Sequence, residues 1–233
     1  MTATKNKIYE SYRFESSYHL TDEHLAQLIS IFNTPIQTVN TTLAGRVSAS
    51  AARLPGIGPI IVKYYRRGGV LAYFVKRTYL KWGETRCQVE YAQLQNAWHS
   101  GISVPEPIAC AYKGHLFYQA WLITREITNQ QSLASLSSTD IGRAETAQKK
   151  LIEQIVLLID NHIYHTDLHP GNVLVDNENR IYVIDFDKAG YYGMNKANLR
   201  KKYLQRWNRA VLKHKLPETL YLKDTALPHF DQS

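Results

Sequence analysis

A loop between a predicted helix and a predicted pair of strands constrains this chain more than any other feature. The loop reads HTDLHPGN at residues 165–172 and follows a helix predicted over 144–162, whose apolar residues recur at helical spacing. Two β-branched runs come next, at 173–175 and 181–184, on either side of the turn-forming segment DNENR. They predict a hairpin. A loop that a helix and a hairpin hold at both ends can keep its polar side chains in fixed positions.

The polar residues of this loop and hairpin are of the types that phosphoryl transfer requires. Asp167 and Asn172 are five residues apart, the spacing of the catalytic-loop pattern H-R-D-x-x-x-x-N, and Asp185 ends the second strand in the run IDFD. Asp167 is predicted to be catalytic, because a carboxylate can orient an attacking hydroxyl and accept its proton. Asn172 and Asp185 are predicted metal ligands, since Mg²⁺ prefers hard oxygen ligands. His165 is expected to shape the loop by packing or hydrogen bonding.

Each of these residues has an ordinary structural alternative. An aspartate before a turn is most often a cap, and DNENR is a common kind of hairpin turn. The joint pattern is far more specific than any one residue, because the loop, the strand pair and the second aspartate must all occur at the right spacing. The pattern therefore indicates a phosphotransferase with ATP and Mg²⁺ as cofactors.

The order of the predicted elements suggests two lobes. The first half combines short strands with one helix over 84–99, and the second half is mainly helical apart from the hairpin. A polar stretch rich in Ser and Thr, at 128–141, is predicted to be a linker or loop. The other expected elements are a helix over 22–32 capped by Thr21, strands over 37–39, 46–49, 60–65, 107–112 and 115–124, and a final helix over 196–215. The final helix is expected to set an apolar stripe of Leu199, Tyr203, Trp207 and Val211 against a face of Arg and Lys residues, which include Arg206 and Arg209.

With these motifs the chain resembles the protein-kinase-like superfamily, in the loop version that small-molecule kinases such as aminoglycoside phosphotransferases carry. The resemblance implies an α+β, bilobal fold with a small antiparallel-sheet N-lobe over residues 1–127 and a mainly helical C-lobe over 128–233. Thr166 stands where typical protein kinases have arginine, and Asp187 replaces the glycine of D-F-G. The chain also lacks room for a long activation segment. The resemblance therefore does not favour a regulated protein kinase.

The same resemblance assigns nucleotide-binding roles to residues of the first lobe. Lys63, in the strand IIVKYY, resembles the lysine of V-A-I-K that holds the α- and β-phosphates. Glu90 lies on the following helix, where the glutamate partner of that lysine is expected. Without the resemblance, a lysine in a strand is more often a solvated edge residue. Glu126 and Ile127 follow a strand at the lobe boundary, where the hinge of this fold holds adenine through backbone hydrogen bonds.

The loop that covers the phosphates matches the superfamily least well. G-x-G-x-x-G is absent, and so is a Walker A sequence. Gly45 and Arg46 form the turn between the expected strands, as in the lipopolysaccharide-core sugar kinases. Gly45 and Arg46 are therefore the expected phosphate contacts, and which backbone amides take part stays open.

Over about residues 40–215 the chain is similar to the 3-deoxy-D-manno-octulosonic acid (Kdo) kinase family of lipopolysaccharide inner-core synthesis. Besides the motifs above, the similarity rests on YYRRGG at 64–69, NAWH at 96–99 and LITRE at 122–126, and YRRGG is the most family-specific of these. It implies transfer of the ATP γ-phosphate to the 4-hydroxyl of a Kdo sugar on Kdo-lipid A. A core heptose, an antibiotic or a protein is the alternative acceptor, since acceptor residues lie in the variable C-terminal part.

The net charge of +8, from 28 Lys and Arg against 20 Asp and Glu, points to anionic partners. No nucleic-acid-binding motif is recognised, so nucleic acid is not expected. The similarity implies an acidic, membrane-anchored acceptor and peripheral attachment to the anionic cytoplasmic side of the bacterial inner membrane. The cations concentrated after Lys63 could sit at that surface or could form an ordinary solvated face; they are Arg66, Arg67, Lys76, Arg77, Lys81 and Arg86.

Composition sets further bounds. No run approaches the roughly 20 apolar residues that cross a bilayer, and the N-terminus has no signal-peptide core, so a soluble or peripheral protein inside the cell is expected. Cys87 and Cys110 have no metal-ligand spacing and are predicted to be buried, reduced thiols. A pseudokinase scaffold is the alternative to an enzyme, but a scaffold need not keep the whole catalytic and metal-binding set. The sequence leaves the oligomeric state open.

Overall fold

The computed structural model describes residues 4–34, 38–41, 45–65, 79–80, 83–193 and 195–230. Its architecture is mixed α+β, and by compactness the chain divides into two units. Unit 1 comprises residues 1–40, 46–95 and 106–126, and unit 2 comprises residues 41–45, 96–105 and 127–233.

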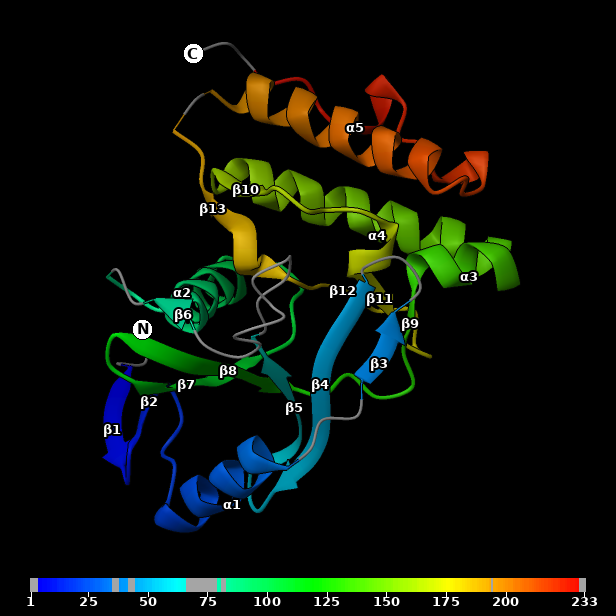
Figure 1. The fold of residues 1–233 in the computed structure, drawn as a ribbon. Coiled ribbons are helices and arrows are strands. Elements are labelled where there is room, and N and C mark those ends of the chain that lie inside the picture. The colour runs from blue at the N-terminus through cyan, green and yellow to red at the C-terminus, as the bar shows by residue number, and fades with distance from the viewer. Residues whose placement is uncertain are drawn as a thin grey trace. The chain divides into compact units, whose positions relative to one another are not determined.

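Unit 1 is built on a sheet with the strand order β1-β2-β7-β8-β5-β4-β3, and β6 pairs with β8 (Figure 1). The strands are β1 (Lys5–Tyr9), β2 (Tyr12–Ser16), β3 (Thr38–Thr41), β4 (Gly45–Leu54), β5 (Gly58–Tyr64), β6 (Tyr79–Leu80), β7 (Pro107–Gly114) and β8 (Phe117–Arg125). The unit also contains α1 (Asp22–Asn33) and most of α2 (Arg86–His99).

The alternation of side chains along β5 decides where Lys63 lies. Ile60, Val62 and Tyr64 are buried, which places the intervening Lys63 on the other face of the strand. Antiparallel pairing sets Lys63 opposite Ala49 of β4 and Leu122 of β8, so the lysine stands on an interior strand of the sheet. A partner on each side holds this part of the backbone in register.

The β7–β8 hairpin depends on one glycine. Gly114 has φ of +110°, a region that L side chains rarely adopt, and a Cβ at this position would overlap the main-chain oxygen of Phe117. Cys110 of β7 and Cys87 of α2 are buried free thiols, as predicted. Burial raises the pKa of Cys110 well above its usual value, which keeps the thiol protonated.

The N-terminal hairpin of β1 and β2 was not predicted, because its run YRFES has only two apolar residues in alternation. Its buried residues join an aromatic cluster with α1, in which Phe32 and Trp121 stack with ring centroids 4.4 Å apart. α1 is capped as predicted by Thr21, whose hydroxyl accepts the backbone N–H of His24 at 3.3 Å. The hairpin is therefore held to the sheet by aromatic packing that only the tertiary structure brings together.

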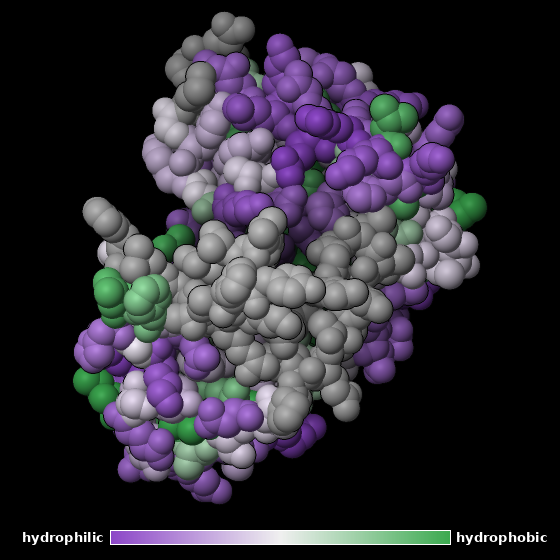
Figure 2. Space-filling model, in the orientation of Figure 1, coloured by the Kyte–Doolittle hydropathy of each residue, from purple (hydrophilic) through white to green (hydrophobic). Residues whose placement is uncertain are grey.

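Unit 2 is mainly helical. Its helices are α3 (Leu133–Thr139), α4 (Ile141–Asp160) and α5 (Lys196–Lys213), and α5 packs on α4 (Figure 1). The predicted apolar stripe of α5 is confirmed, since Leu199, Tyr203, Trp207 and Val211 are all buried. The opposite face of α5 is hydrophilic, as Figure 2 shows. Small sheets pair β11 (Val173–Val175) with β9 (Gln131–Ser132) and β12 (Ile181–Val183), and β10 (Ile163–His165) with β13 (Ala189–Tyr191).

The prediction that residues 128–141 form a linker or loop is wrong. Most of this stretch forms β9 and α3, and Ser132 caps α3 by accepting the backbone N–H of Ser135 at 3.1 Å. Leu133 and Leu136 are fully buried. Serine-rich sequences are weak helix formers, and here the burial of two leucines in unit 2 outweighs that weak propensity.

The aromatic cluster yields a stability prediction for unit 1. Phe32→Ala should lower the free energy of unfolding by about 3–5 kcal/mol, because the side chain is only 3% exposed and stacks on Trp121. Phe117→Ala is the matched control, since Phe117 is 58% exposed and should cost less than about 1 kcal/mol. Urea denaturation followed by circular dichroism measures both. Equal losses in the two variants would contradict the packing role of Phe32.

Candidate active site

The loop at 165–172 is anchored by the ring of His165, which is fully buried. His165 Nδ1 accepts the backbone N–H of Asp167 at 3.3 Å, and Nε2 lies 3.0 Å from the main-chain oxygen of Ile184. An acceptor at Nδ1 and a donor at Nε2 describe the neutral imidazole. Burial is the main cause that lowers the pKa of His165, and the hydrogen bond to Ile184 and the charges of Asp185 and Asp167 oppose it only in part. The expected role of His165 in shaping the loop is therefore confirmed.

Tyr203 of α5 holds the same loop from the helical side. Its hydroxyl donates to the main-chain oxygen of Ile163 at 2.8 Å and accepts the backbone N–H of His165 at 2.9 Å. The His165 ring also meets Phe186 edge to face, with centroids 4.7 Å apart. The loop is thus tied to α5 on one side and to the segment after β12 on the other.

Asp167 and Asn172 lie together within the loop. The side-chain amide of Asn172 donates to the main-chain oxygen of Asp167 at 2.9 Å, and Asn172 is only 1% exposed. Since its amide nitrogen is engaged, its amide oxygen is the atom that can face a cation. The carboxylate of Asp167 contacts Arg206 of α5, with Nη2 2.5 Å from Oδ1.

Asp185 is brought to Asn172 by the hairpin. The backbone N–H of Ile184 donates to the main-chain oxygen of Asn172 at 3.0 Å, directly before Asp185. Asp185 has φ of 68° and ψ of 63°, the left-handed region that few residues other than glycine adopt. Such backbone conformations occur mainly where the surrounding structure enforces them, often at functional sites. A buried amide oxygen and a carboxylate on facing backbone segments are a donor set that suits Mg²⁺ completed by phosphate and water.

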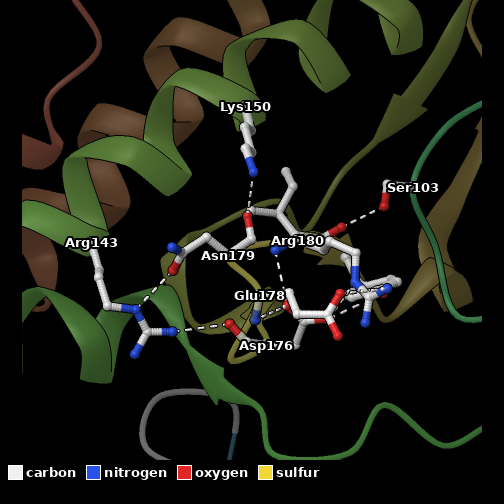
Figure 3. Close-up of polar contacts among 9 residues, drawn as sticks. Ser103, Arg143, Lys150, Asp176, Glu178, Asn179 and Arg180 are labelled. Atoms are coloured by element: carbon white, nitrogen blue, oxygen red, sulfur yellow. Dashed lines mark hydrogen bonds and ion pairs between the residues drawn. The ribbon is translucent and has the colours of Figure 1, made fainter.

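The turn of the β11–β12 hairpin is closed by Asp176 (Figure 3). One carboxylate oxygen accepts the backbone N–H groups of Glu178 and Arg180, each at 2.9 Å, and the other accepts Arg180 Nε at 2.7 Å. Burial by itself would raise the pKa of Asp176, but these hydrogen bonds outweigh it and the pKa lies below its usual value. The segment DNENR is therefore an ordinary hairpin turn, which was one of the structural alternatives considered from the sequence.

Helix α4 clamps this turn from one side. Arg143 donates to Asn179 Oδ1 at 2.8 Å and to the main-chain oxygen of Asp176 at 2.9 Å, and Lys150 Nζ donates to the main-chain oxygen of Asn179 at 2.7 Å (Figure 3). Ser103 holds the opposite strand, since its main-chain oxygen accepts the N–H of Val183 at 2.8 Å. The far end of the hairpin is fixed in this way, and its near end carries Asn172 and Asp185.

In unit 1, Lys63 and Glu90 form an ion pair. Lys63 Nζ lies 2.8 Å from Oε1 and 3.0 Å from Oε2 of Glu90, and the Tyr65 hydroxyl also donates to Oε2. The Glu90 side chain is 1% exposed and that of Lys63 is 24% exposed. A buried carboxylate with several charged or polar donors keeps a fixed orientation, and that orientation positions the lysine.

The other residues predicted to bind nucleotide lie at the ends of strands β4 and β8. Gly45 begins β4 and Arg46 follows it, while the Arg46 side chain is outside the described residues. Glu126 follows β8 and donates its backbone N–H to the main-chain oxygen of Pro59 at 3.1 Å, and Ile127 comes next. The basic positions 66, 67, 76, 77 and 81 are also outside the described residues. No helix in the described parts of the chain is both long and apolar enough to span a membrane.

Arg206 was not predicted to be a site residue, because it is one of several cations expected on a single basic face of α5. The signal was the position of Arg206 directly before the buried Trp207, at the edge of the apolar stripe that turns toward the loop.

Comparison with known proteins gives consistent matches. The family model described as "Lipopolysaccharide kinase (Kdo/WaaP) family" matches residues 51–223. A protein named 3-deoxy-D-manno-octulosonic acid kinase from Vibrio parahaemolyticus is 32% identical over 166 residues, 70% of this chain and 68% of that protein. Its namesake from Vibrio vulnificus (strain YJ016) is 33% identical over 183 residues, 77% of this chain and 76% of the relative. A namesake from Haemophilus influenzae is 36% identical over 141 residues, 55% of this chain and 56% of the relative.

The buried His165 predicts a pH dependence of stability. Its folded pKa lies below the ordinary value of 6.5, so below about pH 6.5 the unfolded chain takes up a proton that the native chain does not. The free energy of unfolding should therefore fall with decreasing pH by at most about 1.4 kcal/mol per unit from this group. His165→Gln should show a shallower fall between pH 6.5 and 5 in urea denaturation. The exposed His115→Gln control should keep the original slope, and equal slopes for all three proteins would refute the assignment.

Proposed function

This chain belongs to the lipopolysaccharide kinase (Kdo/WaaP) family, and on that premise we propose that it transfers the γ-phosphate of ATP to the 4-hydroxyl of a Kdo sugar on Kdo-lipid A. Its mixed α+β fold is protein-kinase-like. The observation that carries the proposal is the rigid assembly of Asp167, Asn172 and Asp185 on one loop and hairpin, in a chain whose relatives are named Kdo kinases.

The proposed role of Asp167 is to orient the attacking hydroxyl and to accept its proton. The backbone N–H of Asp167 is held by His165, and its main-chain oxygen by Asn172, so the carboxylate projects from a backbone fixed on both sides. Its side chain is 36% exposed, which leaves it accessible to an acceptor. Such positioning contributes to phosphoryl transfer whether the proton leaves early or late.

The proposed metal ligands are Asn172 and Asp185, and the donor types fit Mg²⁺. When bound, the ion neutralises charge on the phosphates and aligns the transferred group. The chain's own contribution is rigidity, since the hydrogen bond between Ile184 and Asn172 and the left-handed backbone of Asp185 set the two donors before any ion arrives. Lys63, oriented by Glu90, is proposed to hold the α- and β-phosphates.

The remaining nucleotide contacts are proposed from the resemblance. Gly45 and Arg46 would cover the phosphates, and the backbone of Glu126 and Ile127 would hold adenine. Residues 1–127 are proposed to act as the nucleotide-covering lobe and residues 128–233 as the lobe that carries the catalytic loop, the metal ligands and the acceptor site.

The direct test of the proposed function is transfer of labelled γ-phosphate from Mg-ATP to purified acceptors. Kdo-lipid A, a heptose-bearing core and a protein mixture are compared, and a further sample contains EDTA. Labelling of Kdo-lipid A alone, abolished by EDTA, is expected. Labelling of the heptose core instead would keep the kinase assignment but make heptose, not Kdo, the acceptor. ATP binding without transfer to any acceptor would support a non-catalytic scaffold.

Replacement of the catalytic aspartate gives the sharpest prediction on this site. Asp167→Asn should lower kcat for the acceptor by about 10²- to 10⁴-fold, because the amide can no longer accept the proton, while the dissociation constant for ATP stays within about twofold. Asp160→Asn is the matched control, because Asp160 also pairs with a cation of α5, Lys196, at 2.6 Å and lies on the exposed side of α4. A kcat for Asp167→Asn equal to that of the control would remove Asp167 from the mechanism.

Peripheral binding to an anionic membrane surface on the cytoplasmic side of the inner membrane is proposed from the acceptor and from the charge of +8. Vesicles of phosphatidylglycerol and phosphatidylethanolamine should co-sediment the protein, and phosphatidylcholine vesicles should not. Removing four charges by R66Q, R67Q, K76Q and R77Q should weaken binding about tenfold or more. The control removes four exposed charges of α5, at Lys201, Lys202, Arg209 and Lys213. Equal losses in both variants would rule out a specific role of the segment after Lys63.

A further inference from the structure

One arginine and two histidines, from the catalytic loop and from α5 with its C-terminal cap, lie around Asp167 within unit 2. Arg206 contacts the Asp167 carboxylate at 2.5 Å, and α5 packs against the 3₁₀ turn Pro170–Asn172 that ends the loop. His169, from the loop, faces His214 at the C-terminal end of α5, with ring centroids 6.2 Å apart. Arg206 of α5 and His214 at its C-cap lie 39 and 47 residues beyond Asp167 in the chain.

His169 accepts a backbone hydrogen bond through one ring nitrogen, which leaves the other ring nitrogen as its donor. Its Nδ1 accepts the backbone N–H of Gly171 at 3.0 Å, so in the neutral ring the proton is on Nε2. Burial is the main cause that lowers the pKa of His169; the charge of Asp167 opposes it, and His214 and Arg206 reinforce it. A neutral imidazole with a donor at Nε2 can support an anion beside Arg206 without adding a full charge.

Arg206 has more donor capacity than its one ion pair uses. Its Nε–H is covered and has no acceptor among the described residues, although the side chain as a whole is 38% exposed. A covered donor without a partner is unfavourable. A guanidinium carries five N–H donors and can engage two carboxylates at once, so the partly exposed side chain of Arg206 has donors left for a second carboxylate beside Asp167.

The proposed acceptor would bring a negative charge close to Asp167, and an arginine between the two carboxylates would offset their repulsion. Kdo is a sugar acid, and its carboxylate is attached to the carbon two positions from the one that carries the 4-hydroxyl. A hydroxyl that approaches Asp167 therefore brings a second carboxylate close to the first, and the two repel each other. A cation already seated on Asp167 turns this repulsion into an attraction for the acid group.

We propose that Arg206, supported by His169, binds the carboxylate of the acceptor sugar and thereby selects an acidic sugar at this site. This inference rests on the proposed function. Without acceptor, Asp167 is the partner of Arg206, and the acceptor acid would join it on the remaining N–H donors of the partly exposed guanidinium. Specificity then comes from the same group that neutralises the catalytic carboxylate.

The test compares two forms of the acceptor, one with the free Kdo carboxylate and one with the methyl ester. The wild-type protein should use the ester about 10- to 100-fold less well in kcat/KM, mainly through KM. Arg206→Gln should lose a similar factor with the free acid and lose little more with the ester. The KM for ATP should not change. Arg209→Gln, the same change at an exposed position three residues along α5, should behave as the wild type with both acceptors.

Two results would overturn the inference alone. One is equal use of acid and ester by the wild-type protein, which needs no variant and decides the matter even if Arg206→Gln fails to fold. The other is a fall in kcat by the same factor with both acceptors in Arg206→Gln, which would make Arg206 a positioning residue for Asp167. Transfer by the wild type only to acceptors without Kdo would overturn the proposed function and this inference with it.

Discussion

The contact between the buried ring of His165 and the main-chain oxygen of Ile184 is the constraint on which the candidate active site depends. It joins the start of the catalytic loop to the end of the hairpin, and the N–H of the same Ile184 binds the main-chain oxygen of Asn172. Because the N–H and the C=O of Ile184 are both engaged, the loop cannot shift against the hairpin without breaking these hydrogen bonds. These hydrogen bonds fix the backbone positions of Asp167, Asn172 and Asp185 relative to one another. The neutral state of His165 is part of this arrangement, since a protonated ring would turn its Nδ1 acceptor into a donor facing the N–H of Asp167.

In each unit a site carboxylate is paired with a basic side chain. In unit 1 the buried Glu90 carboxylate is paired with Lys63, and in unit 2 the Asp167 carboxylate is paired with Arg206. Glu90 is buried, so removing its cation would strongly destabilise the fold, although the pair itself adds little net stability. The partly exposed pair of Asp167 and Arg206 is worth little in stability as well. The pairs are therefore better understood as devices for orientation. Lys63 and Arg206 each present a cation whose direction is set before an anionic ligand arrives, and the cost of ordering them is met during folding.

Much of the fold followed from local patterns. The helix α4, the hairpin β11–β12 and the stripe of α5 were predicted because their apolar residues recur at a period that only one kind of element fits. Two elements were not. The β1–β2 hairpin has a short, weak alternation and becomes stable only against α1 and Trp121. The helix α3 has a serine-rich sequence, and burial of Leu133 and Leu136 decides its conformation. In both elements tertiary packing supplies what the local sequence lacks.

The sequence by itself determined the catalytic spacing. Asp167 and Asn172 are five residues apart, and a short hairpin must return the chain to Asn172 at Asp185, so covalent connectivity and strand register bring these residues together. Only the tertiary structure decided that Arg206 completes the cluster. It lies 39 residues beyond Asp167, and its contact depends on how the apolar stripe of α5 seats against the core of unit 2. A pattern of spacing reports which face of a helix is buried, but not which charged group at the edge of that face meets a carboxylate from another element.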